Sequence, residues 1–195
     1  MDDLIIKIEP NLISFNGIEI KNSITENKLI RAIGEPDREI NFRKNYLLYN
    51  GTYVYDRYGM TISFNHGEGS YMTLYYSLKS SLHYYPETTP YNIFHGSLTI
   101  NGFEIPKTDN TKNKTTKEYN TKFKQTIAAF TNVRGFNARD SFFTSIDGTR
   151  IHFQFDYKTM NKIEAAFLTF ESGRKRRKKL PPTAKYPASR ISLLH

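Results

Sequence analysis

The sequence predicts an α+β fold, a tandem repeat of a ββαβββ unit with antiparallel sheets each covered by one helix. Three observations predict it. An eight-residue segment at 13–20 recurs at 98–105 with four identical residues. A short amphipathic helix is expected after each copy, and strands of alternating polarity are expected after each helix. Because this order occurs twice, we interpret the chain as a duplication; the alternative is a chance similarity between two hairpins.

Each recurring segment is expected to form a β-hairpin. Both turns are Asn-Gly dipeptides, Asn16-Gly17 in the first copy and Asn101-Gly102 in the second. Asn and Gly tolerate the positive φ angles that a two-residue hairpin turn requires. The apolar positions on either side agree between the copies, so we expect two short strands joined at each dipeptide.

The first expected helix begins after Thr25 and ends before Gly34. Thr25 is a suitable N-cap residue, and Ile24 can pack on Leu29 as a hydrophobic staple. Gly34 and Pro36 then end the helix. The apolar stripe of the second expected helix consists of Tyr119, Phe123, Ile127 and Phe130.

Strands with one covered face are expected after each helix. Apolar and polar residues alternate there, which is typical of a sheet with one face on a core. The expected strands are 53–56, 60–64 and 72–78 in the first copy and 142–146, 149–155 and 163–170 in the second. The predicted organisation is a first repeat over 1–80, an aromatic-rich connector over 81–97, a second repeat over 98–171 and a basic, disordered tail over 172–195.

The composition excludes several classes of protein. No cysteine occurs among the 195 residues, so disulfides and thiolate metal sites are excluded. No two of the five histidines stand at metal-ligand spacing on one helix, and no nucleophile or phosphate-loop motif occurs. The N-terminus lacks a secretion signal, and no apolar run is long enough to span a membrane. We therefore expect a cytoplasmic protein that is not an enzyme, with no metal site, no cofactor and no catalytic residues.

The positive charge is concentrated at the C-terminal end. The formal net charge is +9, but eight of the 28 Lys and Arg residues fall in 172–195, where there is no acidic residue. The other 20 stand against 19 Asp and Glu residues, so the predicted folded body is nearly neutral. A block of like charge is usually solvated, although it also binds nucleic acid or acidic lipid non-specifically. The uninterrupted basic run is Arg174, Lys175, Arg176, Arg177, Lys178 and Lys179.

Tyrosines are dense in the first copy and the connector. Strand alternation does not allow all of them to face a core, and exposed tyrosine is favoured at protein interfaces. The alternative is that these tyrosines, as amphipathic residues, cover the edges of the sheets. The candidate partner-binding residues are Tyr46, Tyr49, Tyr53, Tyr75, Tyr84, Tyr85 and Tyr91.

Two charged segments are interpreted as structural. Residues 34–38, Gly-Glu-Pro-Asp-Arg, are typical of a helix end followed by a turn, with a local ion pair between Asp37 and Arg38. Residues 55–59, Tyr-Asp-Arg-Tyr-Gly, suit a turn between strands. Neither segment alone indicates an active site.

The order of these motifs resembles a group of bacterial domains found near polymorphic and contact-dependent toxins as immunity proteins. The resemblance covers about the first 80 residues, and the second copy lacks the Gly-x-Pro-x-Arg element. It implies tight protein binding without catalysis, and it transfers no site residues. The resembling positions are Asn16, Gly17, Thr25, Leu29, Gly34, Pro36, Arg38, Tyr55, Asp56 and Gly59.

Two functions therefore stand as expectations. The first is a cytoplasmic immunity or inhibitor protein that neutralises a cognate bacterial toxin by direct binding. The alternative is a nucleic-acid-associated protein that uses its basic tail, which predicts binding that weakens steeply with salt. A third hypothesis, ranked below these two, is an enzyme with an unrecognised site.

Overall fold

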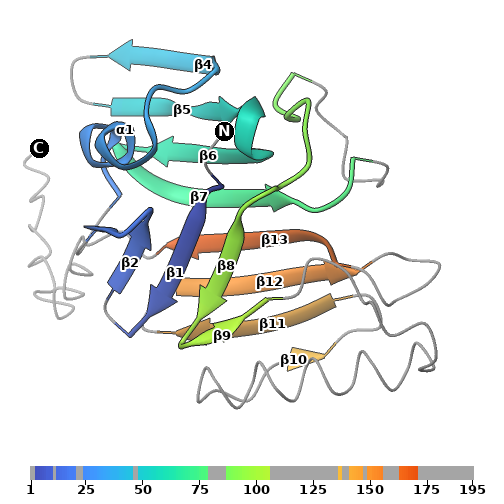
Figure 1. Ribbon diagram of the computed structural model, residues 1–195. Coiled ribbons are helices and arrows are strands. Elements are labelled where there is room, and N and C mark those ends of the chain that lie inside the picture. The colour runs from blue at the N-terminus through green and yellow to red at the C-terminus, as the bar shows by residue number, and fades with distance from the viewer. Residues whose placement is uncertain are drawn as a thin grey trace, which may run out of the picture.

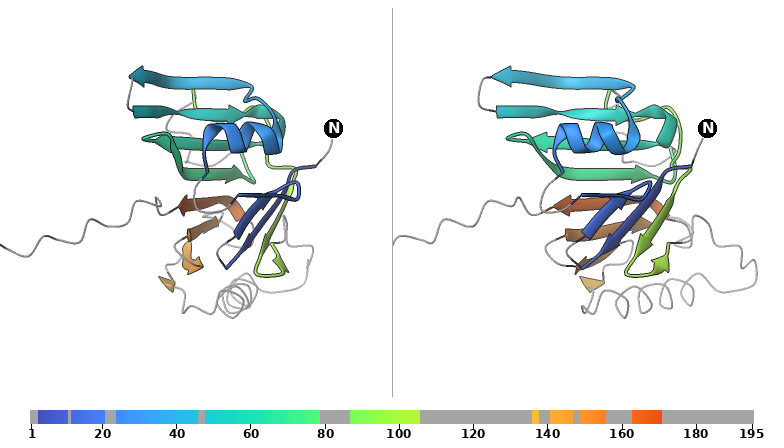
Figure 2. Two further views of the ribbon diagram at one scale, coloured as in Figure 1. Left: turned by 90° about the vertical axis from the view of Figure 1, so that its left-hand side faces the viewer. Right: turned by 60° about the vertical axis from the view of Figure 1, so that its left-hand side comes forward.

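An eight-stranded sheet forms one layer of the protein, and a five-stranded sheet together with one helix forms the other (Figures 1 and 2). The computed structural model describes residues 3–10, 12–20, 24–45, 48–78, 87–105, 136–137, 141–146, 149–155 and 163–170. Within these ranges the fold is α+β and mostly β-sheet, as the sequence predicts.

The five-stranded sheet joins the two predicted hairpins through an N-terminal strand. Its order is β3-β2-β1-β8-β9, and β1 runs antiparallel to β2 but parallel to β8. Both hairpin turns are confirmed: φ is 50° and 79° at Asn16 and Gly17, and 47° and 81° at Asn101 and Gly102. These are the left-handed angles for which an Asn-Gly pair is suited. The strands are β1 (Ile5–Glu9), β2 (Leu12–Phe15), β3 (Ile18–Ile20), β8 (Ser97–Ile100) and β9 (Phe103–Glu104).

The helix α1 (Glu26–Ile33) lies where the sequence predicts it. Thr25 occupies the N-cap position, but its side chain makes no capping hydrogen bond. Gly34 ends the helix at φ 83°, where its N–H donates to the carbonyl of Ile30. The helix buries one face, formed by Leu29, Ala32 and Ile33, against the sheets.

The eight-stranded sheet is antiparallel throughout and has the order β10-β11-β12-β13-β7-β6-β5-β4. A 3-10 turn, η1 (Asp56–Tyr58), joins β5 to β6, and Gly59 follows it in the left-handed conformation. The two-residue turn between β6 and β7 is left-handed at His66 and Gly67. The strands are β4 (Arg38–Asn45), β5 (Leu48–Tyr55), β6 (Met60–Asn65), β7 (Glu68–Tyr75), β10 (Phe136–Asn137), β11 (Ser141–Ile146), β12 (Thr149–Phe155) and β13 (Ile163–Phe170).

One hydrophobic core lies between the two layers and draws on both halves of the chain. Alternate residues of β6, β7 and β12 enter it, as the predicted period of two requires. Its largest fully buried side chains include Tyr53, Tyr55, Phe15, Phe142, Phe153 and Phe155.

The arrangement of the sheets differs from the expectation. We expected each repeat to have its own sheet and covering helix, but strands of both repeats share both sheets. The pairing of β7 with β13 and of β1 with β8 removes four strand edges that separate units would have left open, and open edges are unfavourable. The strands β1, β4 and β10 were not predicted, and the expected second helix lies outside the described residues.

Candidate protein-binding site

The segment at 87–95, here called the connector loop, crosses the ends of β5 and β6 before it enters β8 (Figure 1). Two of its side chains are large, apolar and exposed: Tyr91 at 71% and Ile93 at 40%. Phe94, in contrast, is buried and stacks edge-on against Tyr76. The loop therefore has an anchored side and an exposed side.

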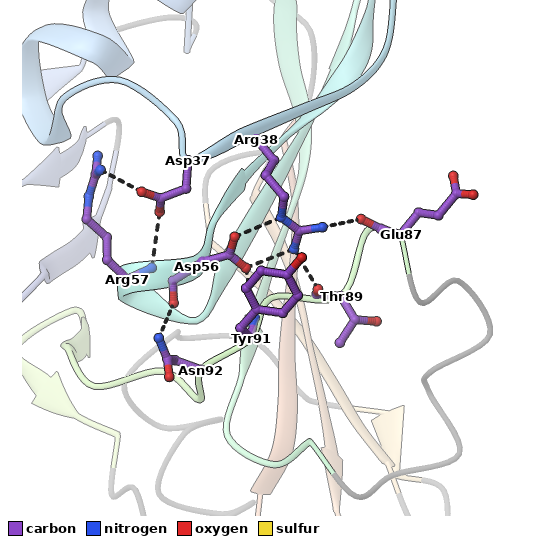
Figure 3. A network of polar contacts seen from close by, with 8 residues as sticks. All are labelled: Asp37, Arg38, Asp56, Arg57, Glu87, Thr89, Tyr91 and Asn92. Carbon is purple, nitrogen blue, oxygen red and sulfur yellow. Dashed lines mark hydrogen bonds and ion pairs between the residues drawn. The ribbon is translucent and has the colours of Figure 1, made fainter.

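Arg38, the first residue of β4, holds the loop main chain. Its Nη1 donates to the carbonyl of Glu87 at 2.7 Å, and its Nη2 donates to the carbonyl of Thr89 at 2.8 Å (Figure 3). The guanidinium group also lies 4.4 Å from the centroid of the Tyr91 ring. A planar group with donors on three nitrogens suits this task, because it fixes two carbonyls and one ring at once.

Asp56, in η1, orients Arg38 and holds the loop directly. Its carboxylate accepts from Nε of Arg38 at 2.7 Å and from Nη2 at 2.8 Å, a bidentate pair. It also accepts from the Tyr91 N–H at 2.8 Å, while the Asp56 carbonyl accepts from the Asn92 amide at 3.0 Å. Burial acts to raise the pKa of Asp56, but the hydrogen bonds from Arg38 and from the Tyr91 N–H outweigh it. The net effect is a pKa below the ordinary value of 3.8. The hydrogen bond to Asp56 likewise raises the pKa of Arg38.

A second ion pair runs alongside the first. Nη1 of Arg57 lies 2.9 Å from Oδ1 of Asp37, and the Arg57 N–H donates to the other oxygen of that carboxylate at 3.1 Å. Arg57 also donates to the carbonyls of Ile33 and Glu35, at the end of α1. We call Asp37, Arg38, Asp56 and Arg57 the crossed network.

The expectation of a local ion pair between Asp37 and Arg38 was wrong, because Arg38 pairs with Asp56 and Asp37 pairs with Arg57. Neighbours along an extended chain point to opposite sides, so each finds its partner in the next charged segment instead. The two segments interpreted as separate turns are thus joined. Together they link the end of α1, the start of β4, η1 and the connector loop.

Two glycines allow the loop to approach this closely. A Cβ on Gly59, at φ 65°, would lie 2.1 Å from the main-chain carbon of Ile93. A Cβ on Gly96 would lie 1.9 Å from the Leu4 carbonyl oxygen, which accepts from the Ser97 N–H at 2.8 Å. The C-terminal end of the loop is therefore fixed by backbone packing that a larger residue would not permit.

The chemistry of this network is positioning. The donors of Arg38 point to Asp56 and to two loop carbonyls, and both Asp56 oxygens accept hydrogen bonds. Groups so engaged hold a conformation rather than a ligand. In the part of the chain that the structure describes, no group of three His, Cys, Asp or Glu residues is arranged to hold a metal ion. What the network presents outward is the Tyr91 ring.

The predicted tyrosines fall in different places. Tyr91 is exposed on the connector loop, and Tyr75 is partly exposed on the face of β7 opposite Leu74. Tyr53 was expected at the partner-binding surface, but it is 1% exposed and belongs to the core. Its ring packs on Phe64, and its hydroxyl donates a hydrogen bond to Glu26. Tyr49 lies on β5. Outside the described residues lie Tyr46, Tyr84, Tyr85 and the basic run Arg174–Lys179.

Sequence reasoning missed the residues that fix the loop. Arg38, Asp56 and Asn92 are not near one another in the chain, so spacing gave no reason to join them. Their signal was weak: the same Asp-Arg dipeptide occurs twice, at 37–38 and at 56–57, each time within three residues of a glycine. Ile93 was missed because one apolar residue in a connector carries no periodicity.

Residues 5–115 match the model of a family described as a domain of unknown function, DUF7738. The chain belongs to this family. The DUF7738 match spans β1 to β9 and so contains the crossed network and the whole connector loop. It also runs across the predicted boundaries at residues 80 and 97. No curated protein and no solved structure matches the chain. Among the described residues, no helix has the length and apolarity needed to cross a membrane.

Proposed function

We propose that this DUF7738 protein is an immunity or inhibitor protein that acts in the bacterial cytoplasm by binding a cognate toxin, without catalysis. One observation carries the proposal: the crossed network holds a loop whose outward residues are an exposed tyrosine and an exposed isoleucine. A scaffold that fixes a loop and leaves its apolar residues in water is suited to inserting that loop into a partner.

The energetic argument concerns preorganisation. Ordering a side chain at an interface costs about 0.5–1.5 kcal/mol, and a loop held before binding avoids much of that cost. Tyrosine is enriched among residues that cost about 2 kcal/mol or more when truncated. Tyr91 is a residue of this type, and it is already held before binding, because Asp56 fixes its main chain and Arg38 supports its ring.

The internal duplication is part of the same proposal. In the eight-stranded sheet, β4 to β7 run inward from one edge and β10 to β13 run inward from the other, so that the last strands of both halves meet at the centre. Since β7 and β13 are antiparallel, a two-fold rotation between them exchanges the halves. This arrangement supports two related copies that share their sheets, although each half contributes four strands to the eight-stranded sheet and the expected ββαβββ unit has three after its helix.

Capture of the partner tests the proposed function. The full chain, affinity-tagged, is incubated with lysate of its source organism, and proteins that remain bound are identified by mass spectrometry. We expect one stoichiometric partner with toxin activity that the chain abolishes. Tyr91→Ala is expected to weaken that binding about 30-fold, the equivalent of 2 kcal/mol. Ile18→Ala is the control, since Ile18 is an exposed apolar residue on β3, outside the connector loop.

The alternative remains a nucleic-acid-associated protein, supported by the six consecutive basic residues of the tail. It predicts that duplex DNA or RNA binds with an affinity that falls steeply between 50 and 200 mM salt, as phosphate contacts do. Deletion of 173–195 then abolishes binding. If no protein is captured and this salt-dependent binding is observed, the inhibitor proposal is refuted and the alternative takes its place.

A further inference from the structure

The N-terminal strand β1 fills the centre of the five-stranded sheet, between β2 and β8 (Figure 1). These two neighbours carry equivalent segments of the repeat, and a half-turn about Lys7 exchanges them: Lys7 faces Ser14 on one side and the equivalent Thr99 on the other. Among the described strands of this sheet, β1 alone has no counterpart in the other copy. We call the place between β2 and β8 the central position.

The central position has to be occupied for the sheet to be stable. The segment that fills it completely buries Leu4, Ile6 and Ile8, and its main chain pairs along both edges. Without it, β2 and β8 would each leave an unpaired edge, and three apolar side chains would be exposed to water. The partners that receive β1 all lie on β2 and β8, so the strand that occupies this position can come from the same chain or from a second copy.

The connection from β1 to β2 is unfavourable for a closed hairpin. Glu9 pairs with Leu12, so only Pro10 and Asn11 connect the strands. The two-residue turns that match the twist of a hairpin require a positive φ at their first residue. The proline ring fixes φ near about −65°, so Pro10 cannot adopt that conformation. The turn types that remain open to it splay the two strands.

The other two-residue turns of the described chain show the contrast. At 16–17, 66–67 and 101–102, both residues have a positive φ, as a matched hairpin turn requires. Pro10 instead suits an extended backbone, and it also favours an extended conformation at Glu9 before it. A short connection that is strained when closed and relaxed when extended favours exchange of the strand that it carries.

We propose that a second copy of this chain docks at the central position by exchange of β1. Each β1 then lies between β2 and β8 of the other copy and regains the same pairs, while residues 10–11 extend from one copy to the other. The contacts within each sheet are unchanged, and the strain at Pro10 is relieved. Exchange of an identical element in this way is a low-cost route to a dimer.

The exchange also links the two copies at the connector loop. The Leu4 carbonyl oxygen accepts from the Ser97 N–H at 2.8 Å, and a Cβ on Gly96 would lie 1.9 Å from it. In the exchanged dimer, the C-terminal end of each loop therefore packs on Leu4 of the other copy. The inference goes beyond the proposed function and does not depend on it, because no toxin takes part in the exchange.

Disulfide capture reports which copy supplies β1. The chain contains no cysteine, and Lys7 of β1 pairs with Ser14 of β2. Paired residues have Cα atoms about 4.5–5.5 Å apart, which allows a disulfide. In a variant that carries Lys7→Cys and Ser14→Cys, the disulfide is intramolecular in the monomer and intermolecular in the exchanged dimer. A non-reducing gel separates the two products.

The variant is unfolded in urea and refolded at about 1 mM, the order of effective concentration at which a short tether presents its own strand. It is then diluted to about 10 µM and oxidised, and we expect a covalent dimer in at least about a tenth of the chains. Adding Pro10→Asn and Asn11→Gly supplies the turn of the other hairpins and should lower the amount of dimer at least about fivefold. His66→Asn is the matched control: it makes the same Asn-Gly turn between β6 and β7 and should change the amount less than about twofold.

Lys7→Cys alone measures cross-linking by collision, and a covalent dimer no more abundant than in this variant overturns the proposal. A dimer whose disulfides are all intramolecular overturns it too, because the copies then associate through another surface. An equal amount of dimer with the Asn-Gly connection refutes the role of Pro10. The unmodified chain, refolded in the same way, is measured by size-exclusion chromatography with light scattering. Elution as monomer alone overturns the proposal without any substitution.

Discussion

The pair between Arg38 and Asp56 is expected to contribute far more to stability than the pair between Arg57 and Asp37. The side chains of the first pair are 23% and 13% exposed, and those of the second are 26% and 29% exposed. Asp56→Asn keeps the shape and one acceptor oxygen but removes the charge that faces Arg38. A surface pair contributes about 0–1 kcal/mol, whereas breaking a buried pair costs about 3–5 kcal/mol. Because Asp56 is largely buried while Arg38 is partly exposed, we expect a loss between these two ranges, about 2 kcal/mol.

Urea unfolding followed by circular dichroism measures this loss. With a slope of about 2 kcal/mol per molar, the midpoint of the Asp56→Asn variant is expected to fall by about 1 M. Asp37→Asn is the matched control and is expected to lower the midpoint by less than half as much. Hydrogen exchange in residues 87–95 should rise in Asp56→Asn, because the Tyr91 N–H loses a charged acceptor. Equal midpoint shifts in the two variants, or unchanged exchange in the loop, would refute the assignment of Asp56 as the residue that holds the loop.

Two further predictions follow from the same region. Because the folded-state pKa of Asp56 is below its ordinary 3.8, its contribution is present above that value and is lost as the pH falls through the folded-state pKa. The stability difference between wild type and Asp56→Asn, measured by urea unfolding from pH 7 to 2.5, should therefore shrink below pH 4; a constant difference would contradict it. Gly59→Ala should cost at least about 3 kcal/mol, because it adds a backbone clash to the strain of positive φ. Gly17→Ala, with positive φ but nothing within 4 Å of its Cβ, should cost only about 1 kcal/mol by the same assay; equal losses would remove the argument for close loop packing.

Local features of the fold could be predicted well. The Asn-Gly turns, the end of α1 at Gly34 and the strands of both halves follow from conformational preferences and from a period of two. The strand β1 was missed although Ile6 and Ile8 alternate with exposed residues, because its short run becomes a strand only by pairing with β2 and β8. The strand β4 is an edge strand with only two apolar residues, Ile40 and Phe42, which is too short an alternation to predict a strand.

For the candidate site too, the sequence identified one exposed residue but not the contacts that hold it. Tyr91 was identified from composition, since exposed tyrosine is typical of interfaces. The residues that hold Tyr91 were not identified, because Arg38 and Asp56 are separated by 18 residues and meet only when β4 and β5 pair. Tyr53 was assigned to the wrong class because the sequence does not say which face of β5 meets the core.

The sequence by itself determined the turns, the helix end, most strands and the separation of the basic tail from a nearly neutral body. These depend on properties of neighbouring residues: backbone preference, side-chain alternation and local charge. Only the tertiary structure decided that the two halves share their sheets, that the ion pairs cross between segments, and that Tyr71, Phe167 and His152 form one layer. The physical reason is that strand pairing and ion pairing have no preferred separation along the chain, so the partners are selected by edge closure and core packing.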